Sequence, residues 1–242
     1  MRLHRVYTDQ DLQPGQEVSI RDRSAHYLTR VLRISAGQPI CLFNGDGHDY
    51  AAEIVRPGKS RVIIAVNSRL PVACESKLQI TVVQAISRGE RMDQTLQKCT
   101  ELGVQVFQPL FSERVEVKLR PEKLERRMKH WQGVVVSACE QSGRAFVPRV
   151  LEPVDFGDWL NQPGHGCRLV LAPGARRSLA SLEIPGPLEL AIGPEGGFSD
   201  VELELMVSRS VQPVSLGPRI LRTETAAPAA VAVLQALAGD FA

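Results

Sequence analysis

Three short segments combine glycine and proline with the end of an apolar run, and together they could hold a ligand through their main chain. They are "LAPGA" (171–175), "IGPEGGFS" (192–199) and "LGPRILRTETA" (216–226). Glycine adopts positive φ and lets a ligand touch the backbone, whose amides donate hydrogen bonds. One such segment alone is an ordinary tight turn, since Gly and Pro are the usual turn residues. Three of them after consecutive strands predict a pocket for a neutral or zwitterionic organic ligand.

The spacing within these segments narrows the class of ligand. Gly193, Gly196 and Gly197 can take positive φ and let a ligand touch the backbone, and Ser199 with Glu202 predicts a capping box for the following helix. The segment 192–199 matches neither GxGxxG nor the GK[ST] ending of a P-loop nor the GxSxG nucleophile elbow. The histidines are scattered and the cysteines form no CxxC pair, so the sequence predicts no metal site.

Strands and helices alternate from residue 78 onward. The run "LQITVVQAI" (78–86) is typical of a strand buried on both faces. The pattern predicts further strands over 104–111, 167–173, 188–194 and 211–217, and helices over 90–103, 121–142, 199–209 and 224–238. This alternation predicts an α/β fold with a mostly parallel sheet and helices on both faces. Ligands bind at the carboxyl ends of such strands, where the three segments lie.

The first seventy residues have a different pattern. They predict short strands over 2–7, 38–44, 49–55 and 61–70, interrupted by a helix over 24–34 with Ser24 as its N-cap. Residues 71–77 resemble a linker. We therefore predict two domains, residues 1–72 and residues 73–242.

Composition limits the partners and the compartment. A formal net charge of +2 means that any nucleic-acid surface is a local patch rather than a field of the whole molecule. Five widely spaced cysteines indicate reduced thiols and not a disulfide framework. The start of the chain lacks an apolar signal region, and no apolar run reaches membrane-spanning length. We expect a soluble cytoplasmic protein without a membrane partner.

Longer motifs connect the chain to a known family. "IGPEGGFS" followed by "SLGPRILRTETA" resembles the paired signature of the SPOUT methyltransferases. Together with "SRGERMDQTLQKCTELGV" (87–104), "LFSERVEVK" (110–118) and "ACEQSGR" (138–144), the chain closely resembles the bacterial 16S rRNA uridine-N3 methyltransferase family. The resemblance covers nearly the whole chain, including "HYLTRVLR" in the first domain, and its motifs are long and specific.

This resemblance implies a SPOUT-type α/β domain with a C-terminal trefoil knot, preceded by a small PUA-like β-barrel that helps to bind RNA. It also implies a homodimer and a knot that cradles S-adenosylmethionine against the main chain of 193–197, where a Cβ would collide with it. By position, the implied cofactor-binding residues are Leu171, Ala172, Gly193, Pro194, Glu195, Gly196, Gly197, Leu216, Gly217, Leu221, Arg222 and Thr223.

The implied reaction moves a methyl group to N3 of a uridine in 16S rRNA of the small ribosomal subunit. N3 lies on the pairing edge, so the base must be unpaired or flipped out. Loss of the imide proton leaves an anion that a nearby guanidinium would stabilise. Arg222 and Arg88 are the candidates for that guanidinium. Glu195 is a possible base, although a carboxylate in a glycine-rich turn also caps backbone amides.

Basic residues supply the candidates for RNA contact. The predicted RNA-binding set is Arg2, Arg5, Arg21, Arg23, Arg30, Arg33, Lys98 and Arg144. The basic segment 118–130 is interleaved with glutamates and is interpreted mostly as a solvated helix face. In the last helix, Pro228 is tolerated if the helix begins at residue 224 or 225, which places the proline in the first turn.

Two alternatives stay open. The first is another SPOUT enzyme that acts on tRNA or on a different rRNA position. The second is a non-catalytic RNA-binding protein of ribosome assembly, which the intact glycines and the intact "LRTETA" disfavour. A metabolic nucleotide-dependent enzyme is disfavoured because neither phosphate-binding motif is present.

Overall fold

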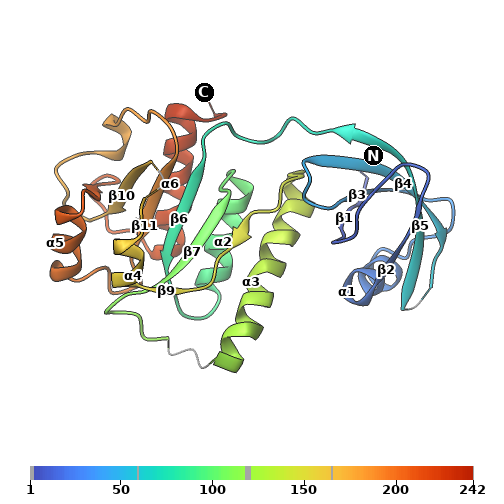
Figure 1. Cartoon of the computed structure of the whole chain (residues 1–242), viewed down its shortest axis with the longest axis horizontal. Coiled ribbons are helices and arrows are strands. Elements are labelled where there is room, and N and C mark those ends of the chain that lie inside the picture. Colours follow the sequence, from blue (N-terminus) through green and yellow to red (C-terminus); the bar gives the residue numbers. More distant parts are fainter. Residues whose placement is uncertain (1–2, 59, 118–120, 165, 242) are drawn as a thin grey trace. The chain divides into compact units, whose positions relative to one another are not determined.

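The computed structural model describes residues 3–58, 60–117, 121–164 and 166–241, apart from the side chains of residues 22, 23 and 121 (Figure 1). The chain forms two compact units. The first consists of Met1–Glu75 and Cys139–Val147, and the second of Ser76–Ala138 and Pro148–Ala242. The first unit thus takes in a short segment from the middle of the chain, which the predicted domain 1–72 does not include.

A five-stranded sheet forms the body of the first unit. Its strands are β1 (Arg5–Tyr7), β2 (Glu17–Arg21), β3 (Pro39–Phe43), β4 (His48–Arg56) and β5 (Arg61–Pro71), in the order β1-β3-β4-β5-β2. Neighbouring strands are antiparallel except β1 and β3. Alternate residues of β5, namely Val62, Ile64 and Val66, are buried in one core with Val18 and Ile20 of β2. Such alternation is typical of a sheet with one buried face.

The helix predicted over 24–34 begins earlier than expected and changes its winding. Helix α1 spans Asp22–His26, and a π-helical turn over Tyr27–Val31 follows it directly. Ser24 therefore lies inside the helix, and its prediction as N-cap is wrong. Ala25 and Leu28 are fully buried and attach these turns to the core of the sheet.

Arg5 ties the segment Cys139–Val147 to this sheet. Its Nη1 donates a hydrogen bond of 2.7 Å to the carbonyl of Cys139, and its Nη2 lies 2.6 Å from Asp49 Oδ1. The guanidinium carbon also lies 4.4 Å from the centre of the Phe43 ring, within reach of a cation–π interaction. The side chain of Arg5 is only 7% exposed, so it stabilises the fold of the first unit from within.

The second unit contains a parallel sheet. Its strands are β6 (Ile80–Ala85), β7 (Val106–Phe111), β8 (Arg149–Val150), β9 (Val154–Asp155), β10 (Cys167–Leu171), β11 (Leu188–Ile192) and β12 (Gln212–Val214). The order is β12-β10-β11-β6-β7-β8, with β9 also paired to β7, and every pairing is parallel. All five residues of β11 are buried, as expected for a central strand. The predicted mostly parallel sheet is confirmed.

Helices cover both faces of this sheet. They are α2 (Arg91–Glu101), α3 (Pro121–Ser142), α4 (Phe156–Asn161), α5 (Asp200–Ser208) and α6 (Thr223–Ala238), with a short 3-10 helix over Leu179–Ser181. On one face, Val83 of β6 packs in a cluster with Trp159 of α4 and Met206 of α5. The next residue, Gln84, points to the other face and bonds to Thr223 of α6, which packs against α2. Within the described ranges, no helix combines the length and apolar character needed to cross a membrane.

Pro228 lies deeper in α6 than predicted. The helix begins at Thr223, with Arg222 as its N-cap, so Pro228 is in the second turn. There it cannot donate to the carbonyl of Glu224, four residues earlier, and an interior proline costs about 3 kcal/mol. Neighbouring Ala227, Ala230 and Val231 are fully buried, so packing of the helix offsets this cost.

Candidate active site

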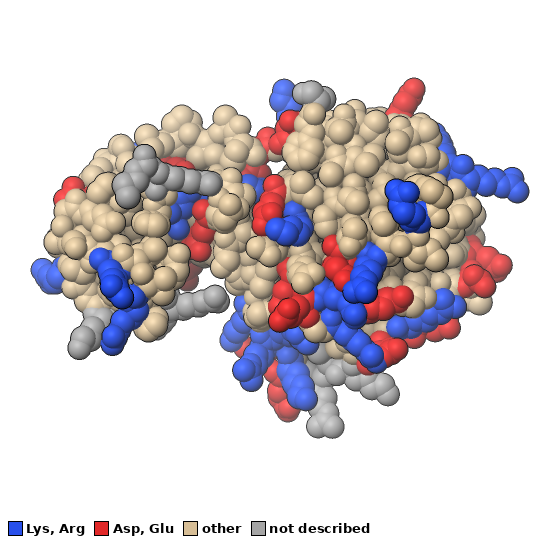
Figure 2. Space-filling view, turned by 180° about the vertical axis from the view of Figure 1, so that it is seen from behind, with Lys and Arg blue, Asp and Glu red and all other residues tan. Residues whose placement is uncertain are grey.

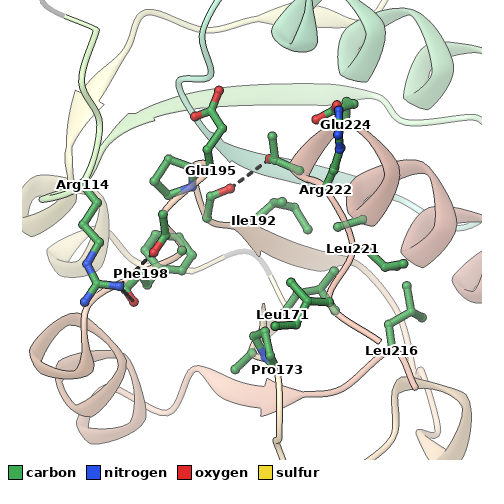
Figure 3. A pocket seen from close by; sticks show the side chains of 18 of the residues that line it. Arg114, Leu171, Pro173, Ile192, Glu195, Phe198, Leu216, Leu221, Arg222 and Glu224 are labelled. Carbon is green, nitrogen blue, oxygen red and sulfur yellow. Dashed lines mark hydrogen bonds between the residues drawn. The ribbon is translucent and has the colours of Figure 1, made fainter. Parts of the chain in front are cut away.

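The three predicted loops meet around one pocket at the carboxyl ends of β10, β11 and β12. Its volume is about 600 Å³, in the range of cavities that enclose a small organic ligand. Figure 3 shows Leu171, Leu216 and Leu221 gathered on one side, and Glu195, Arg222 and Glu224 toward the other. The lining includes every predicted cofactor-binding residue: Leu171, Ala172, Gly193, Pro194, Glu195, Gly196, Gly197, Leu216, Gly217, Leu221, Arg222 and Thr223.

The glycines of the pocket differ from one another in backbone conformation and in the space around their Cα atoms. Only Gly197 of the central loop has positive φ (+67°), and Gly217 in the third loop has φ +77°. A Cβ on Gly193 would lie 3.0 Å from the amide nitrogen of Phe198, so the turn itself excludes a side chain there. A Cβ on Gly196 would lie 3.4 Å from carbons of Arg114. The crowding at Gly193 therefore comes from the protein itself, whereas a Cβ at Gly196 would make an ordinary contact, and neither glycine uses the positive φ that it could take.

Arg114, from the loop after β7, supports the central loop from outside. Its Nη1 donates to the carbonyl of Gly196 at 2.8 Å and to that of Phe198 at 3.4 Å (Figure 3). The loop closes on itself through the Gly197 amide, which donates to the Pro194 carbonyl at 2.9 Å. One guanidinium thus fixes two carbonyl groups on either side of Gly197, which holds the shape of the central loop.

A carboxylate network fastens the same loop to the start of α5. Ser199 is the N-cap, and its capping box with Glu202 is present as predicted. Glu202 Oε1 also accepts the Glu113 amide at 2.9 Å, and Ser199 Oγ donates to Glu113 Oε2 at 2.7 Å. Ser199 and Glu202 are buried, so these bonds are shielded from water. The loops after β7 and β11 therefore act as one block.

Glu195 accepts hydrogen bonds from the segment after β6. Its Oε1 lies 3.0 Å from the Arg88 amide and 2.7 Å from Arg91 Nη1. Burial tends to raise the pKa of Glu195, but bonds from the Arg88 amide, its own amide and Arg91 outweigh burial, and the pKa is lowered. A carboxylate with a lowered pKa is a poor proton acceptor. The geometry therefore assigns Glu195 to positioning and does not support the predicted role as a base.

Thr223 joins the third loop to the second. Its Oγ1 donates to the Gly193 carbonyl at 2.9 Å, drawn as a dashed line in Figure 3, and accepts from Gln84 Nε2 at 3.0 Å. Thr223 is 5% exposed and Gln84 fully buried. This chain of bonds fixes the first residue of α6 against the end of β11, beside the pocket.

Arg222 immediately precedes Thr223 and lines the pocket with an exposed side chain. Among the described residues, no carboxylate lies within 4 Å of its guanidinium, in contrast to Arg91. Arg91 Nη1 pairs with Glu195, and Arg91 Nε lies 3.7 Å from Glu224 Oε1. Arg91 is therefore neutralised by two pocket carboxylates, whereas Arg222 keeps its charge available to a ligand.

Arg88 does not line the pocket. Its guanidinium forms an ion pair with Glu116, in the loop after β7, and its side chain is 59% exposed. Only its backbone amide reaches the site, through Glu195. The contacts of Arg88 therefore do not support its prediction as the guanidinium beside the substrate, because its charge is paired with Glu116 outside the pocket.

The predicted RNA-binding residues fall into three groups. Arg21, Arg30 and Arg33 are exposed on the first unit, and Lys98 is exposed on α2, 3.3 Å from Glu101. Arg5 and Arg144 are 7% and 3% exposed in ion pairs with Asp49 and Glu75, which does not fit contact with phosphate and corrects their assignment. Arg2 and the side chain of Arg23 lie outside what the structure describes.

Sequence reasoning missed five charged residues of the pocket lining: Asp200 and Arg219, and the three residues Arg91, Arg114 and Glu224, which contact other loops. The roles of these last three depend on contacts between loops that are far apart in sequence. In the sequence, only the location of Arg91, Arg114 and Glu224 within segments that carry the family resemblance could have indicated their roles. In the part of the chain that the structure describes, no cluster of three His, Cys, Asp or Glu residues suits a metal ion.

Two family models match the chain. The model of an RNA methyltransferase domain matches residues 74–235, and that of an RNA methyltransferase PUA domain matches residues 12–67. The α/β fold, the pocket and both matches define the class: an RNA methyltransferase in which a PUA domain precedes the methyltransferase domain.

Individual relatives narrow the class to one family. The chain is 34% identical to the ribosomal RNA small subunit methyltransferase E of Buchnera aphidicola (subsp. Schizaphis graminum) over 242 residues, 99% of this chain and 98% of the relative. The enzyme of that name from Neisseria gonorrhoeae, solved bound to S-adenosyl methionine, is 39% identical with a TM-score of 0.95 over 100% of both chains. A Legionella pneumophila protein solved with bound S-adenosylmethionine is 40% identical, with a TM-score of 0.96 over 99% of this chain and 100% of that one. The chain belongs to the ribosomal RNA small subunit methyltransferase E family, which confirms the resemblance.

Proposed function

We propose that this protein transfers the methyl group of S-adenosylmethionine to N3 of a uridine in the 16S rRNA of the small ribosomal subunit. The observation that carries the proposal is the convergence of three loops and all twelve predicted cofactor residues on one pocket, in a chain of this family. The relatives solved with the cofactor support its use here.

The chemistry of the pocket fits S-adenosylmethionine, a ligand with an apolar base, a cationic sulfonium and hydrogen-bond donors. Leu171, Leu216 and Leu221 offer an apolar surface to the base, and two carboxylates, Glu195 and Glu224, lie toward the other side (Figure 3). Glu224 Oε2 is buried without a hydrogen-bond partner among the described residues. Leaving a buried acceptor unpaired is costly, so this atom suits a donor group of the ligand.

S-adenosylmethionine supplies an electrophilic methyl group, so the protein has only to orient the reactants and accommodate charge on the uridine. N3 of uridine lies on its pairing edge, and the base must leave any pairing before it can enter the pocket. As N3 loses its proton, negative charge spreads over the imide, and the Arg222 guanidinium is placed at the pocket to stabilise it. Glu195 and Thr223 hold the loops in place during this step.

The finer architecture belongs to the same proposal. We place a trefoil knot in the C-terminal segments and a homodimer in solution, as in the family that the sequence resembles, with the cytoplasm as the compartment. The exposed apolar residues Leu237 and Phe241 near the end of the alanine-rich helix α6 support a partner surface there. Sedimentation equilibrium tests the dimer, and a mass equal to one chain at micromolar concentration contradicts it.

Methyl transfer from labelled S-adenosylmethionine onto small ribosomal subunits that lack the modification tests the activity. We expect label in 16S rRNA, and mass spectrometry of nuclease fragments to place it on N3 of one uridine. Label at another atom or another rRNA position, or on tRNA alone, selects the other SPOUT activity. A protein that binds subunits without binding the cofactor is an assembly factor, and the proposed reaction is then wrong.

A further inference from the structure

The first half of α3 carries three basic residues on one flank. Lys123, Arg126 and Arg127 follow the i, i+3, i+4 spacing that places side chains on one flank of a helix. We call these three residues the basic flank. Glu122 lies four residues before Arg126, near the basic flank, whereas Glu125 pairs with Lys129. Most side chains described over 122–130 are exposed, in line with the interpretation of a solvated helix face, and residues 118–120 lie outside the described residues.

The charge of the basic flank is not neutralised within the described part of the chain. No carboxylate described there lies within 4 Å of Lys123, Arg126 or Arg127. The remaining lysine of this half, Lys129, differs from these three because it pairs with Glu125 at 2.7 Å. Three unpaired cations on one flank produce a local positive potential, although the whole chain carries a net charge of only +2.

The basic flank leads toward the pocket. His130, one turn after Arg126 and Arg127, lies 2.7 Å from Asp93 through its Nε2. Asp93 is in the first turn of α2, two residues after Arg91, which lines the pocket. Figure 2 shows Lys and Arg side chains gathered along the lower edge of the molecule, where Figure 1 places the amino-terminal end of α3.

We propose that the basic flank of α3 binds phosphates of the RNA strand that flanks the nucleotide in the pocket. This inference rests on the proposed function and extends its RNA contact to the methyltransferase domain. Phosphate is the partner that unpaired Lys and Arg fit, because each contact neutralises a backbone charge. A protein partner fits less well, since no large apolar side chain described on α3 is exposed and protein interfaces have an apolar centre.

The test replaces the three cations together and leaves the helix intact. The variant K123Q/R126Q/R127Q removes the charges with residues that favour helix. The control, K129Q, removes one cation of the same half-helix that is already paired with a carboxylate. The substrate is the small ribosomal subunit lacking the modification, and KM is measured from about 50 to about 200 mM salt, where phosphate contacts weaken steeply.

For the triple variant we expect a rise in KM for subunits of roughly 10- to 100-fold near 100 mM salt, and a salt slope shallower by about 2. Its kcat at saturating subunits and its affinity for S-adenosylmethionine, measured by calorimetry, should equal those of the wild type, because the flank does not line the pocket. K129Q should keep the wild-type KM and slope. Preserved cofactor affinity shows that the triple variant is folded.

A triple variant with the wild-type KM and salt slope overturns the inference. The inference is also overturned if K129Q weakens binding as much as the triple variant does, because binding then depends on the total positive charge and not on the position of the basic flank. If the wild type binds subunits but transfers no methyl group, the proposed function fails, and the inference about the basic flank is then tested by the salt dependence of subunit binding. The same salt slope in the triple variant and the wild type overturns the inference. A slope that is shallower in the triple variant but not in K129Q supports it.

Discussion

The guanidinium groups around the pocket differ in what they contact. Arg114 donates to two carbonyls, Arg91 lies between two carboxylates, and Arg88 pairs with Glu116. Each of these three arginines holds one loop to another, and carboxylates compensate the charges of Arg91 and Arg88. Arg222 lines the same pocket, and no carboxylate of the described chain lies within 4 Å of it. Arg219 also lines the pocket with an exposed side chain and without a described carboxylate within 4 Å, so Arg222 and Arg219 are the arginines whose charge is available to a substrate anion.

Replacing Arg222 with Ala should therefore affect the chemical step more than the fold. We expect kcat to fall roughly 10- to 1,000-fold, as for loss of one donor to a developing anion. Single-turnover methyl transfer with saturating cofactor measures this. The thermal midpoint should change little, since the side chain of Arg222 does not cap α6. Arg149→Ala, an exposed arginine on β8 at the far edge of the sheet, is the matched control. Near-wild-type turnover of Arg222→Ala would remove Arg222 from the mechanism.

Glu195→Gln tests positioning against base catalysis. The lowered pKa means that Glu195 is fully ionised at neutral pH, and its contribution to stability is lost only as pH falls below the ordinary glutamate value of about 4.3 and through the folded pKa. The pH profile of kcat between about 6 and 9 should thus be the same in variant and wild type. We expect KM for the cofactor to rise several-fold, because the bond to Arg91 weakens. Loss of a limb of that profile, with kcat reduced by about 100-fold or more, would instead identify Glu195 as the base.

Among the elements, the loops after β6, β7 and β11 act together because charged residues link them. The loop after β7 contributes Glu113 and Arg114 to the central loop, and the segment after β6 contributes the Arg88 amide and Arg91 to Glu195. A parallel sheet brings these loops to one edge, and the links fix their shape there. The cradle therefore depends on strands that do not themselves border the pocket.

Arg114→Ala should loosen this cradle from outside. We expect KM for S-adenosylmethionine to rise about 10-fold and stability to fall by about 1 kcal/mol, because two carbonyls lose a charged donor. At saturating cofactor, kcat should recover to near the wild-type value, since Arg114 does not touch the substrate in this proposal. Arg114→Lys keeps one cationic donor and should restore part of the affinity. An unchanged KM in the alanine variant would show that the central loop holds its shape without Arg114.

The predictability of the elements from sequence follows their length and the range of their contacts. Helix α3 begins and ends at the residues predicted, because its apolar stripe is long and Pro121 marks its start. The strands β2, β8 and β9 and helix α4 were missed, since two to six residues carry too little periodicity. The position of the pocket followed from the rule for parallel sheets. The role of Gly193 did not, because its constraint is a contact within the folded turn.

At the scale of the whole molecule, each of the two units contains at least one buried cysteine that can serve as a probe of its opening. Cys41 and Cys139 are buried in the first unit, Cys99 is fully buried in the second, and Cys74 is exposed. Burial raises the pKa of Cys41 to about 11 and that of Cys139 to about 12, and it raises the pKa of Cys99 as well. A buried thiol with a raised pKa does not react until its surroundings open. Labelling of each cysteine therefore reports the opening of its own unit.

S-adenosylmethionine should protect the second unit more than the first. At about 100 times its Kd, a ligand that binds only the folded state stabilises it by about 2.7 kcal/mol, which slows opening-limited labelling about 100-fold. Because the pocket is built entirely from the second unit, we expect this slowing at Cys99 and a smaller one at Cys41. Peptide mass spectrometry of a Cys74→Ser/Cys167→Ser variant measures both rates without the exposed thiol of Cys74 and the partly buried thiol of Cys167. Equal protection of both thiols would mean that the two units open as one, and no protection of Cys99 would place the cofactor outside this pocket.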